Sequence, residues 1–439
     1  MISQDFLKTI ATERNLSKSE LEVLSLAMEG HGTAAIASHL QISGDAVRKR
    51  LSEVYQKFKI PGRGPVKLTK LQQILVNRYQ EYLQQQKNTP NRSPVSPSPP
   101  PTSPQPQNRR DWGEAPDVSV FYGRGDELKT LEHWISQERC RLVALLGMSG
   151  IGKTALSVKL AKQLQDKFEV VLWRSLRQSP SVSDLLAALI PDLSQQPETV
   201  IPKTPDQRIS WLIDYFRQHR CLVILDGVES ILQSGKLAGI YREGYEEYGD
   251  FFRRLGEEPH QSCVLITSQE KLNEISLLEG ETSPVRSFKL EGLGDAARLI
   301  LKEKGLSGEK KWQPLIQGYR GNPFMLKLVA TTIKEVFDGD VTDFLSTTLF
   351  THDVSDFIEE VLDRLSELEE RLLVYLAHQK EAISFKALQQ HFSDTSPQEV
   401  IRALGSLSQR SLVEKSEGRF ILPPAVREVT LQLMTPLED

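Results

Sequence analysis

The sequence of 439 residues is long enough for about three domains of roughly 150 residues, each with its own core. Its 39% hydrophobic, 26% charged and 7% aromatic residues exclude a collagen, a coiled-coil rod and a wholly disordered chain. The longest strongly apolar run, Leu142 to Leu146, is far shorter than the roughly 20 residues that span a bilayer, and the first residues lack a signal-peptide pattern. We therefore expect a cytoplasmic protein with no membrane partner.

Cysteine and histidine patterns give no indication of a metal site built from protein side chains alone. Cys140, Cys221 and Cys263 each stand at or just before an apolar run, without metal-like spacing. We expect them to be small buried hydrophobes. The eight histidines show no paired ligand spacing.

The net charge of −4 is unevenly distributed. Residues 1–87 contain thirteen Lys or Arg and eight Asp or Glu, a net charge of +5, so the remainder carries −9. The basic residues concentrate from Arg48 to Lys70, where only Glu53 opposes them. This pattern is typical of a polyanion-binding surface, and a solvated helix face is the alternative.

A Pro- and Ser-rich stretch separates this basic block from the rest. Residues 88–110 contain almost nothing apolar to bury, and their prolines disfavour both helix and sheet. We predict a semi-rigid linker over residues 88–112. A ligand strip for an aromatic-groove module is the alternative.

The middle of the chain alternates strand-like and helix-like segments. The strand-like apolar runs are 142–146, 170–173, 222–225 and 264–266. This alternation predicts an α/β domain with a parallel sheet. Beyond about Leu290 helical periodicity dominates, as in 326–336 and 362–376.

A phosphate-loop pattern follows the first of these runs. Gly147 to Thr154 reads as Gly, four residues, Gly-Lys-Thr, with a strand expected over 141–146 and a helix over 154–165. Glycines let backbone N–H groups turn toward a phosphate, and the helix N-terminus adds partial positive charge. We expect Lys153 to contact the β and γ phosphates and Thr154 to bind Mg²⁺. The alternative is a Gly-rich turn with a chance lysine.

An acidic residue ends another buried strand. Asp226 closes the run from Cys221 and is the expected second magnesium ligand. Glu229 lies three residues further on, where it can orient or deprotonate an attacking water. The equally weighted alternative for Glu229 is a carboxylate that stabilises a helix N-terminus.

From about residue 115 to near the C-terminus, the motifs resemble the NB-ARC module of the signal-transduction (STAND) ATPases. The matching segments, in chain order, are Phe121-Tyr122-Gly123-Arg124, residues 171–176, residues 264–268 and Gly321-Asn322-Pro323. In relatives, the first of these borders the adenine and the last packs against the base. Residues 366–434 look like the winged helix that closes over the nucleotide, with a capping box at Ser396-Pro-Gln-Glu399 and a wing hairpin ending at Leu422.

The resemblance, together with the phosphate-loop pattern, implies the following adenine-nucleotide contacts: Tyr122, Arg124, Gly147, Ser149, Gly150, Ile151, Gly152, Lys153, Thr154, Ala155 and Pro323. It implies ATP or ADP with Mg²⁺ as cofactors. Lys153, Asp226 and Glu229 are the expected catalytic residues.

Three departures from the family pattern modify these expectations. Gly227 stands where many relatives have a second acidic residue, so we expect slow hydrolysis. Gln269 replaces the sensor strand's usual arginine. Leu422-Pro423-Pro424 stands where relatives have a Met-His-Asp motif, so the closed state needs another latch.

Residues 17–63 carry a second resemblance, to the helix-turn-helix of LuxR-type response regulators. The residues that carry it are a capping-box opening at Ser17-Lys-Ser-Glu20, Ile36-Ala37, and Ile42-Ser43 before a third helix. On that helix Val47, Leu51, Val54 and Phe58 bury one face, which leaves the expected DNA-binding residues Arg48, Lys49, Arg50 and Lys57 for phosphates or base edges. A helical adaptor that binds protein partners is the alternative. A helix over 68–83 would complete the domain or pair two chains.

These observations predict five segments: a helix-turn-helix domain over 1–87, the linker, a P-loop domain over 113–289, a helical ARC subdomain over 290–350 and a winged helix over 351–439. The expected function is a slow ATPase switch that self-associates in the ATP state and whose output is DNA binding, with a separate sensor protein as a candidate partner. The alternatives are a signalling or defence scaffold and an AAA-type origin-binding ATPase.

Overall fold

The computed structural model describes residues 10, 14, 16–28, 33–40, 42–58, 71, 75, 109–194, 202–348 and 350–434. It divides into two compact units, Met1–Thr102 and Ser103–Asp439, which we describe separately. Within these described ranges, no helix is both long enough and apolar enough to cross a membrane.

The N-terminal unit contains the three helices predicted from its sequence. They are α2 (Lys18–Met28), α3 (Thr33–Leu40) and α4 (Gly44–Lys57). The capping box is present, because the Ser17 N–H donates to Glu20 Oε2 at 2.5 Å and the Glu20 N–H donates to Ser17 Oγ at 3.3 Å. Ser43 caps α4 by accepting from the Ala46 N–H at 3.2 Å.

The apolar stripe of α4 is buried, as predicted. Val47, Leu51, Val54 and Phe58 are all at most 8% exposed. Of the helix expected over 68–83, Leu71 and Leu75 are helical and fully buried, and its remaining residues lie outside the described part of the chain.

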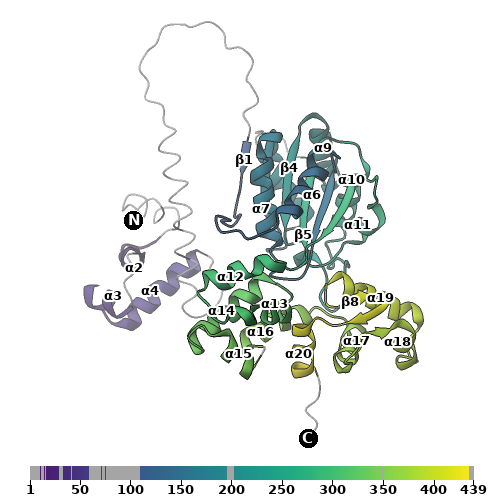
Figure 1. Ribbon diagram of the computed structural model, residues 1–439. Helices are drawn as coiled ribbons and strands as arrows, with labels where there is room; N and C mark the ends of the chain where they lie inside the picture. The colour runs from purple at the N-terminus through teal and green to yellow at the C-terminus, as the bar shows by residue number, and fades with distance from the viewer. Residues whose placement is uncertain are drawn as a thin grey trace. The chain divides into compact units, whose positions relative to one another are not determined.

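In the second unit, the described residues form a six-stranded sheet in the order β1-β3-β4-β5-β2-β6, with every neighbouring pair parallel. The prediction of a parallel α/β sheet is confirmed (Figure 1). The strands are β1 (Arg109–Asp111), β2 (Leu142–Leu146), β3 (Val170–Ser175), β4 (Cys221–Asp226), β5 (Cys263–Ser268) and β6 (Val285–Lys289).

Both edge strands differ from the sequence prediction. β1 lies within the predicted linker, which therefore ends before Arg109, because its charged residues pair with β3 at the sheet edge. β6 was not predicted, because its sequence, Val-Arg-Ser-Phe-Lys, contains no apolar run. The helix after the phosphate loop begins at Lys153 and ends at Leu164, one residue earlier at each end than expected.

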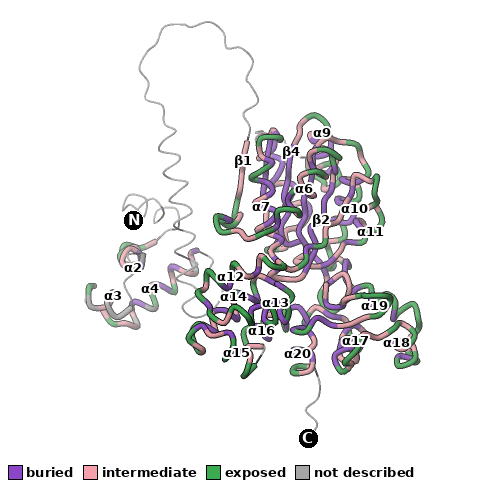
Figure 2. Tube along the Cα trace, viewed as in Figure 1, coloured by how far each residue is buried: buried purple, intermediate pink, exposed green. Residues whose placement is uncertain are grey.

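Helices cover both faces of the sheet. α6 (Gly125–Ser136) and α7 (Lys153–Leu164) pack on one face, and the short η1 (Gln165–Lys167) follows α7. The other face is covered by α8 (Val182–Ser194), α9 (Pro205–Gln218), η3 (Val228–Ile231), α10 (Glu247–Glu257) and α11 (Asn273–Leu278). The central strands are buried along their length, as Figure 2 shows for β2 and β4.

The C-terminal part is helical apart from one small sheet. Its first group of helices is η4 (Gly294–Ala296), α12 (Ala297–Glu303), η5 (Glu309–Lys311), α13 (Trp312–Gly318), α14 (Pro323–Val336), α15 (Val341–Thr347) and α16 (His352–Leu362). The second group is α17 (Glu367–His378), α18 (Phe385–His391), α19 (Pro397–Gln409) and α20 (Pro424–Leu433), with β7 (Ile383–Ser384), β8 (Glu414–Ser416) and β9 (Arg419–Ile421). Both groups share one continuous hydrophobic core.

Two local predictions for this part are confirmed and one is wrong. Ser396 and Glu399 form the capping box of α19, and β8 and β9 form the antiparallel wing hairpin. The stretch 362–376 is not one helix. α16 ends at Leu362 and α17 starts at Glu367, because Ser366 and Glu369 form a second capping box that begins a new helix.

Candidate functional site

The loop from Gly147 to Thr154 joins the fully buried β2 to α7. Gly150 and Gly152 have φ of +71° and +104°, a region that favours glycine. A Cβ on Gly150 would lie 2.6 Å from the Phe324 Cβ and 3.0 Å from the Phe357 Cζ. The loop therefore requires glycine both for its backbone turn and for the close approach of α14 and α16.

Lys153, the first residue of α7, folds back over this loop. Its Nζ donates to the carbonyl oxygens of Gly147 at 2.8 Å and Met148 at 3.1 Å, and the residue is 8% exposed. Burial lowers the pKa of Lys153, and the nearby carboxylates of Glu229 and Asp226 act in the opposite direction. The ammonium group is thus held at the centre of the loop, where an anion would compensate its charge.

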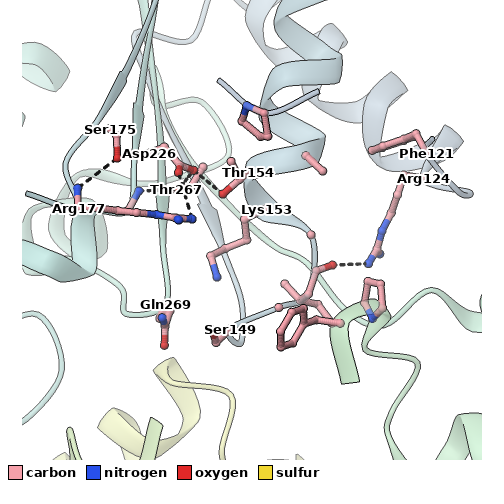
Figure 3. Close-up of a pocket in the computed structure, with 18 of the residues that line it drawn as sticks. Phe121, Arg124, Ser149, Lys153, Thr154, Ser175, Arg177, Asp226, Thr267 and Gln269 are labelled. Atoms are coloured by element: carbon pink, nitrogen blue, oxygen red, sulfur yellow. Dashed lines mark hydrogen bonds and ion pairs between the residues drawn. The ribbon is translucent and has the colours of Figure 1, made fainter. Parts of the chain in front are cut away.

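Asp226 brings three elements together at the carboxyl ends of the strands. It is 1% exposed, and its Oδ1 accepts from the hydroxyls of Thr154 at 2.7 Å and Thr267 at 2.8 Å. Thr267 belongs to β5, which lies between the strand that ends at Asp226 and the strand that feeds the loop. The Arg177 Nη2 lies 3.9 Å from Oδ2 of the same carboxylate (Figure 3).

Glu229 lies in the first turn of η3, beside this cluster. Gln269 donates its side-chain N–H to Glu229 Oε1 at 3.1 Å. The other oxygen, Oε2, is buried and has no hydrogen-bond partner among the residues that the structure describes. Glu229 therefore has the helix N-terminal position that one hypothesis predicts. It also has the free acceptor oxygen that the other hypothesis, activation of a water, requires.

These groups line one cavity of about 490 Å³ at the carboxyl edge of the sheet. Figure 3 shows Phe121 and Arg124 at one end, Arg177 and Asp226 at the other, and Lys153 between them. All the residues predicted to bind nucleotide or to act in catalysis line it except Gly147, whose carbonyl instead accepts from Lys153.

Arg124 and Tyr122 shape the apolar end of the cavity. Arg124 has a left-handed backbone (φ 67°), and its guanidinium donates to Glu127 at 2.9 Å and to the Ile151 carbonyl at 3.1 Å. The Tyr122 hydroxyl is buried without a partner in the described ranges. Arg124 therefore fixes the loop, and Tyr122 lines the cavity beside it.

The helical layer, by which we mean the first group of C-terminal helices (η4 to α16), reaches the phosphate loop through the N-terminus of α14. The Asn322 Nδ2 donates to the Ser149 carbonyl at 2.9 Å, while its Oδ1 accepts from the backbone N–H groups of Phe324 and Met325. The Phe324 N–H also donates to the Gly150 carbonyl at 3.3 Å. One buried side chain thus caps the helix and binds the loop at the same time.

A second contact joins the sheet domain to the winged helix through four buried or half-buried charges, Glu270, Glu369, Arg364 and Arg410. We call this set the Glu270 cluster. Glu270, just after β5, accepts from Arg364 and Arg410, each at 2.7 Å. The Arg410 Nε lies 3.3 Å from Glu369 Oε1, an ion pair without hydrogen-bond geometry. Arg364 also donates to the Glu229 carbonyl at 3.1 Å, so the cluster touches the cavity wall.

In the N-terminal unit, the structure describes the side chains of three of the four predicted DNA-binding residues. Lys49 is exposed and Arg50 is half-buried, whereas the Arg48 side chain lies outside the described residues. Lys57 makes a contact that the sequence did not predict, because its Nζ donates to both oxygens of the buried Glu20, at 2.8 and 2.7 Å. This ion pair holds α4 against α2.

Sequence reasoning missed several residues that line the cavity. They are Glu114, Pro116, Val120, Trp173, Ser175, Arg177, Thr267, Leu293, Phe324 and Lys327. Ser175, Arg177 and Thr267 lie within four residues of the end of a predicted apolar run, 170–173 or 264–266, so their position at the ends of parallel strands was the available signal.

Comparison with protein families identifies two domains. The NB-ARC domain model matches residues 124–238, and the model for bacterial regulatory proteins of the luxR family matches residues 14–66.

Among curated relatives, a WD repeat-containing protein of Nostoc sp. is 45% identical over 334 residues, which are 72% of this chain and 27% of that protein. A disease resistance protein of Oryza sativa subsp. japonica is 32% identical over 111 residues, 24% of this chain and 10% of that protein. The chain therefore spans about a quarter and about a tenth of these two relatives.

Among solved structures, a Signal Transduction ATPase with Numerous Domains (STAND) protein with a tetratricopeptide repeat sensor from Pyrococcus horikoshii is similar. It is 21% identical, with 74% of this chain and 44% of that chain covered and a TM-score of 0.35.

Proposed function

We propose that this chain, which carries an NB-ARC domain and a LuxR-type helix-turn-helix domain, is a switch driven by exchange of ADP and ATP. The observation that carries the proposal is the cavity in which Lys153, Thr154 and Asp226 converge and to which α14 binds through Asn322. A bound polyphosphate would contact the sheet domain and lie beside the helical layer. The number of its phosphates can therefore bias how the helical layer is placed against the sheet domain.

Magnesium fits the groups at the end of β4. The Thr154 hydroxyl and the Asp226 carboxylate lie 2.7 Å apart, and both are the hard oxygen donors that Mg²⁺ prefers. These two residues would hold the ion, which neutralises phosphate charge when bound.

We infer slow hydrolysis. No second carboxylate follows Asp226, because Gly227 stands there, and Glu229 is the available base at the cavity. Gln269 occupies Glu229 Oε1, which leaves Oε2 to accept a proton from water.

The Glu270 cluster is our candidate for the latch that the Leu422-Pro423-Pro424 segment lacks. It binds the winged helix to the end of β5 in the arrangement that we assign to the ADP state. Release of this contact in the ATP state would free a surface for self-association, and a separate sensor protein can act on the same equilibrium.

Substitution of the loop lysine tests the nucleotide proposal. Denaturing the purified wild-type protein should release ADP or ATP, and Lys153→Ala should abolish that retention, because the ammonium group is the cation held at the centre of the loop. Lys167→Ala is the matched control, since this exposed lysine, which pairs with Glu132, lies beyond the end of α7 that is opposite the loop. Full retention by Lys153→Ala would refute the assignment.

We propose DNA binding as the output of the N-terminal domain. The full-length chain should bind duplex DNA with an affinity that falls steeply with salt, and a Lys49→Ala/Arg50→Ala variant should weaken binding and flatten the salt dependence. Lys18→Ala, on α2, is the control. The alternative, a protein-recruiting scaffold, is favoured by the loss of Lys57 to its ion pair with Glu20, and it predicts no DNA binding even at low salt.

A further inference from the structure

We propose that Arg177 binds the terminal phosphate of ATP and so distinguishes ATP from ADP. The inference rests on the proposed nucleotide function and adds to it a residue that the phosphate-loop and strand-end motifs do not include. Arg177 lies in the turn between β3 and α8 and lines the cavity at the end marked by Asp226.

The backbone around Arg177 is held in place. The Leu176 N–H donates to the Asp226 carbonyl at 2.8 Å, and the Arg177 N–H donates to Ser175 Oγ at 3.3 Å. The Ser230 hydroxyl donates to the Leu176 carbonyl, so η3 binds the same turn. Arg177 is therefore anchored to the strand end that carries the magnesium candidate.

The guanidinium group of Arg177 is available to a ligand. Its side chain is 73% exposed, and its one ion pair in the described ranges is the 3.9 Å contact with Asp226 Oδ2, at the outer limit of such pairs. Arg124, the other arginine of the cavity, is 4% exposed and donates to Glu127, Gly292 and Ile151. Arginine has five donors in a planar fork that matches a phosphate group.

Gly227 makes room for this side chain. Its φ is +82°, and a Cβ at this position would approach the Arg177 Cγ to 3.3 Å. Arg177 therefore extends over Gly227, the position at which this chain lacks a second carboxylate. At the sensor position, Gln269 is neutral and bound to Glu229, so Arg177 and Lys153 are the cations at this end of the cavity.

The order of groups along the cavity indicates which phosphate Arg177 contacts. Figure 3 shows Phe121 and Arg124 at the end opposite Arg177, with Lys153 between. A nucleotide with its base at the Phe121 end and its phosphates along the loop brings its last phosphate closest to Arg177. ADP is shorter by one phosphate and does not reach it.

The test compares two nucleotides on the full-length, nucleotide-stripped protein. We expect Arg177→Met to weaken binding of AMP-PNP with Mg²⁺ by at least about tenfold and to change ADP binding less than about threefold, as measured by calorimetry. Arg177→Lys should lie between, because lysine keeps the charge and loses the fork. Arg253→Met, which removes an exposed arginine paired with Asp250 on α10, is the control and should change neither affinity.

Each outcome decides the proposal. If Arg177→Met lost the same affinity for both nucleotides, or lost affinity for neither, the role of Arg177 would be overturned. The proposed nucleotide function would still stand in that case, because the wild-type protein binds. Failure of the wild-type protein to bind either nucleotide would overturn both. Because Arg177 is exposed and weakly paired, unchanged thermal unfolding of the two variants should accompany the binding data.

Discussion

At the scale of single residues, the fold clearly lowers the proton affinity of His260. It follows α10, its ring packs against Phe216 at 5.5 Å between centroids, and its Nε2 lies 3.0 Å from the Leu255 carbonyl. Burial lowers the pKa of His260 to about 4, and the Leu255 contact opposes this shift without cancelling it. The imidazole is therefore neutral in the folded domain at pH values where an unfolded histidine is charged.

The sign of the resulting pH dependence follows from linkage. Between about pH 6.5 and 4 the unfolded state binds more protons at this site, so stability falls as the pH falls through that window. At pH 5 the loss relative to pH 7.5 is about 2 kcal/mol for this one group. We expect urea unfolding of His260→Gln to show a correspondingly smaller loss between these pH values. The exposed His352→Gln is the control, and parallel pH profiles for His260→Gln and wild type would contradict the assignment.

At the scale of elements, local patterns predicted the structure where the signal lies within a few residues. β2, β4 and β5 are built on continuous apolar runs and are buried on both faces. The capping boxes that begin at Ser17 and Ser396 could each be predicted from four consecutive residues. The phosphate loop was readable for the same reason, because its glycines, lysine and threonine are contiguous.

Contacts between distant parts of the sequence were not predictable in this way. β1 has no apolar residue, and it is held by Arg109, which donates to the carbonyls of Asp192 and Leu193, and by the ion pair of Arg174 with Asp111. Arg177 lies outside every motif, and the matching segment 264–268 gives no signal that its Thr267 contacts Asp226; both residues meet Asp226 only through the sheet order. No spacing in the sequence relates such partners, because the fold brings them together.

The N-terminus of α14 provides the test at this scale. Asn322→Asp keeps the cap but replaces the amide that donates to Ser149 with a carboxylate oxygen facing a carbonyl, beside the phosphate loop. We expect Asn322→Asp to reduce nucleotide affinity more than Asn322→Ala does, since the added charge repels phosphate. Asn322→Ala should instead lower thermal stability by about 1 kcal/mol through loss of the cap.

The control removes a comparable cap that does not contact the phosphate loop. Asp340 caps α15 by accepting from the Thr342 N–H at 2.6 Å. Asp340→Ala should cost similar stability and leave nucleotide affinity unchanged. Equal affinities for the two Asn322 variants would show that the amide does not act on the loop.

At the scale of the second unit, the Glu270 cluster connects the nucleotide cavity to the winged helix. Arg364 donates both to Glu270 and to the Glu229 carbonyl, and Arg410 donates to Glu270 and to the Lys236 carbonyl. The Ser406 hydroxyl donates to Glu369 at 2.5 Å and accepts from the Ala238 N–H at 2.6 Å. Glu270 follows Gln269, which binds Glu229, so we expect a shift of Glu229 to reach this interface.

Removal of Arg410 should open this interface. Arg410, Glu270 and Glu369 are each at most 2% exposed, and loss of one partner from a buried ion pair costs about 3–5 kcal/mol. Without Arg410, the two carboxylates of the cluster are left with a single arginine, Arg364. We expect Arg410→Met to increase hydrogen exchange in α19 and in residues 234–239 and to speed ADP release. Arg371→Met, which breaks an exposed ion pair with Asp394 on the same winged helix, should change neither.

A second substitution separates the charge effect from a general loss of folding. Glu270→Gln in the Arg410→Met background restores a balance of one carboxylate, Glu369, and one arginine, Arg364, in the cluster, so the double variant should be less destabilised than the two single effects added together. ADP release should remain fast in the double variant, because the contact between β5 and α19 is still missing. If Arg410→Met exchanged hydrogen and released ADP at wild-type rates, the cluster would be a structural contact and the latch would lie elsewhere.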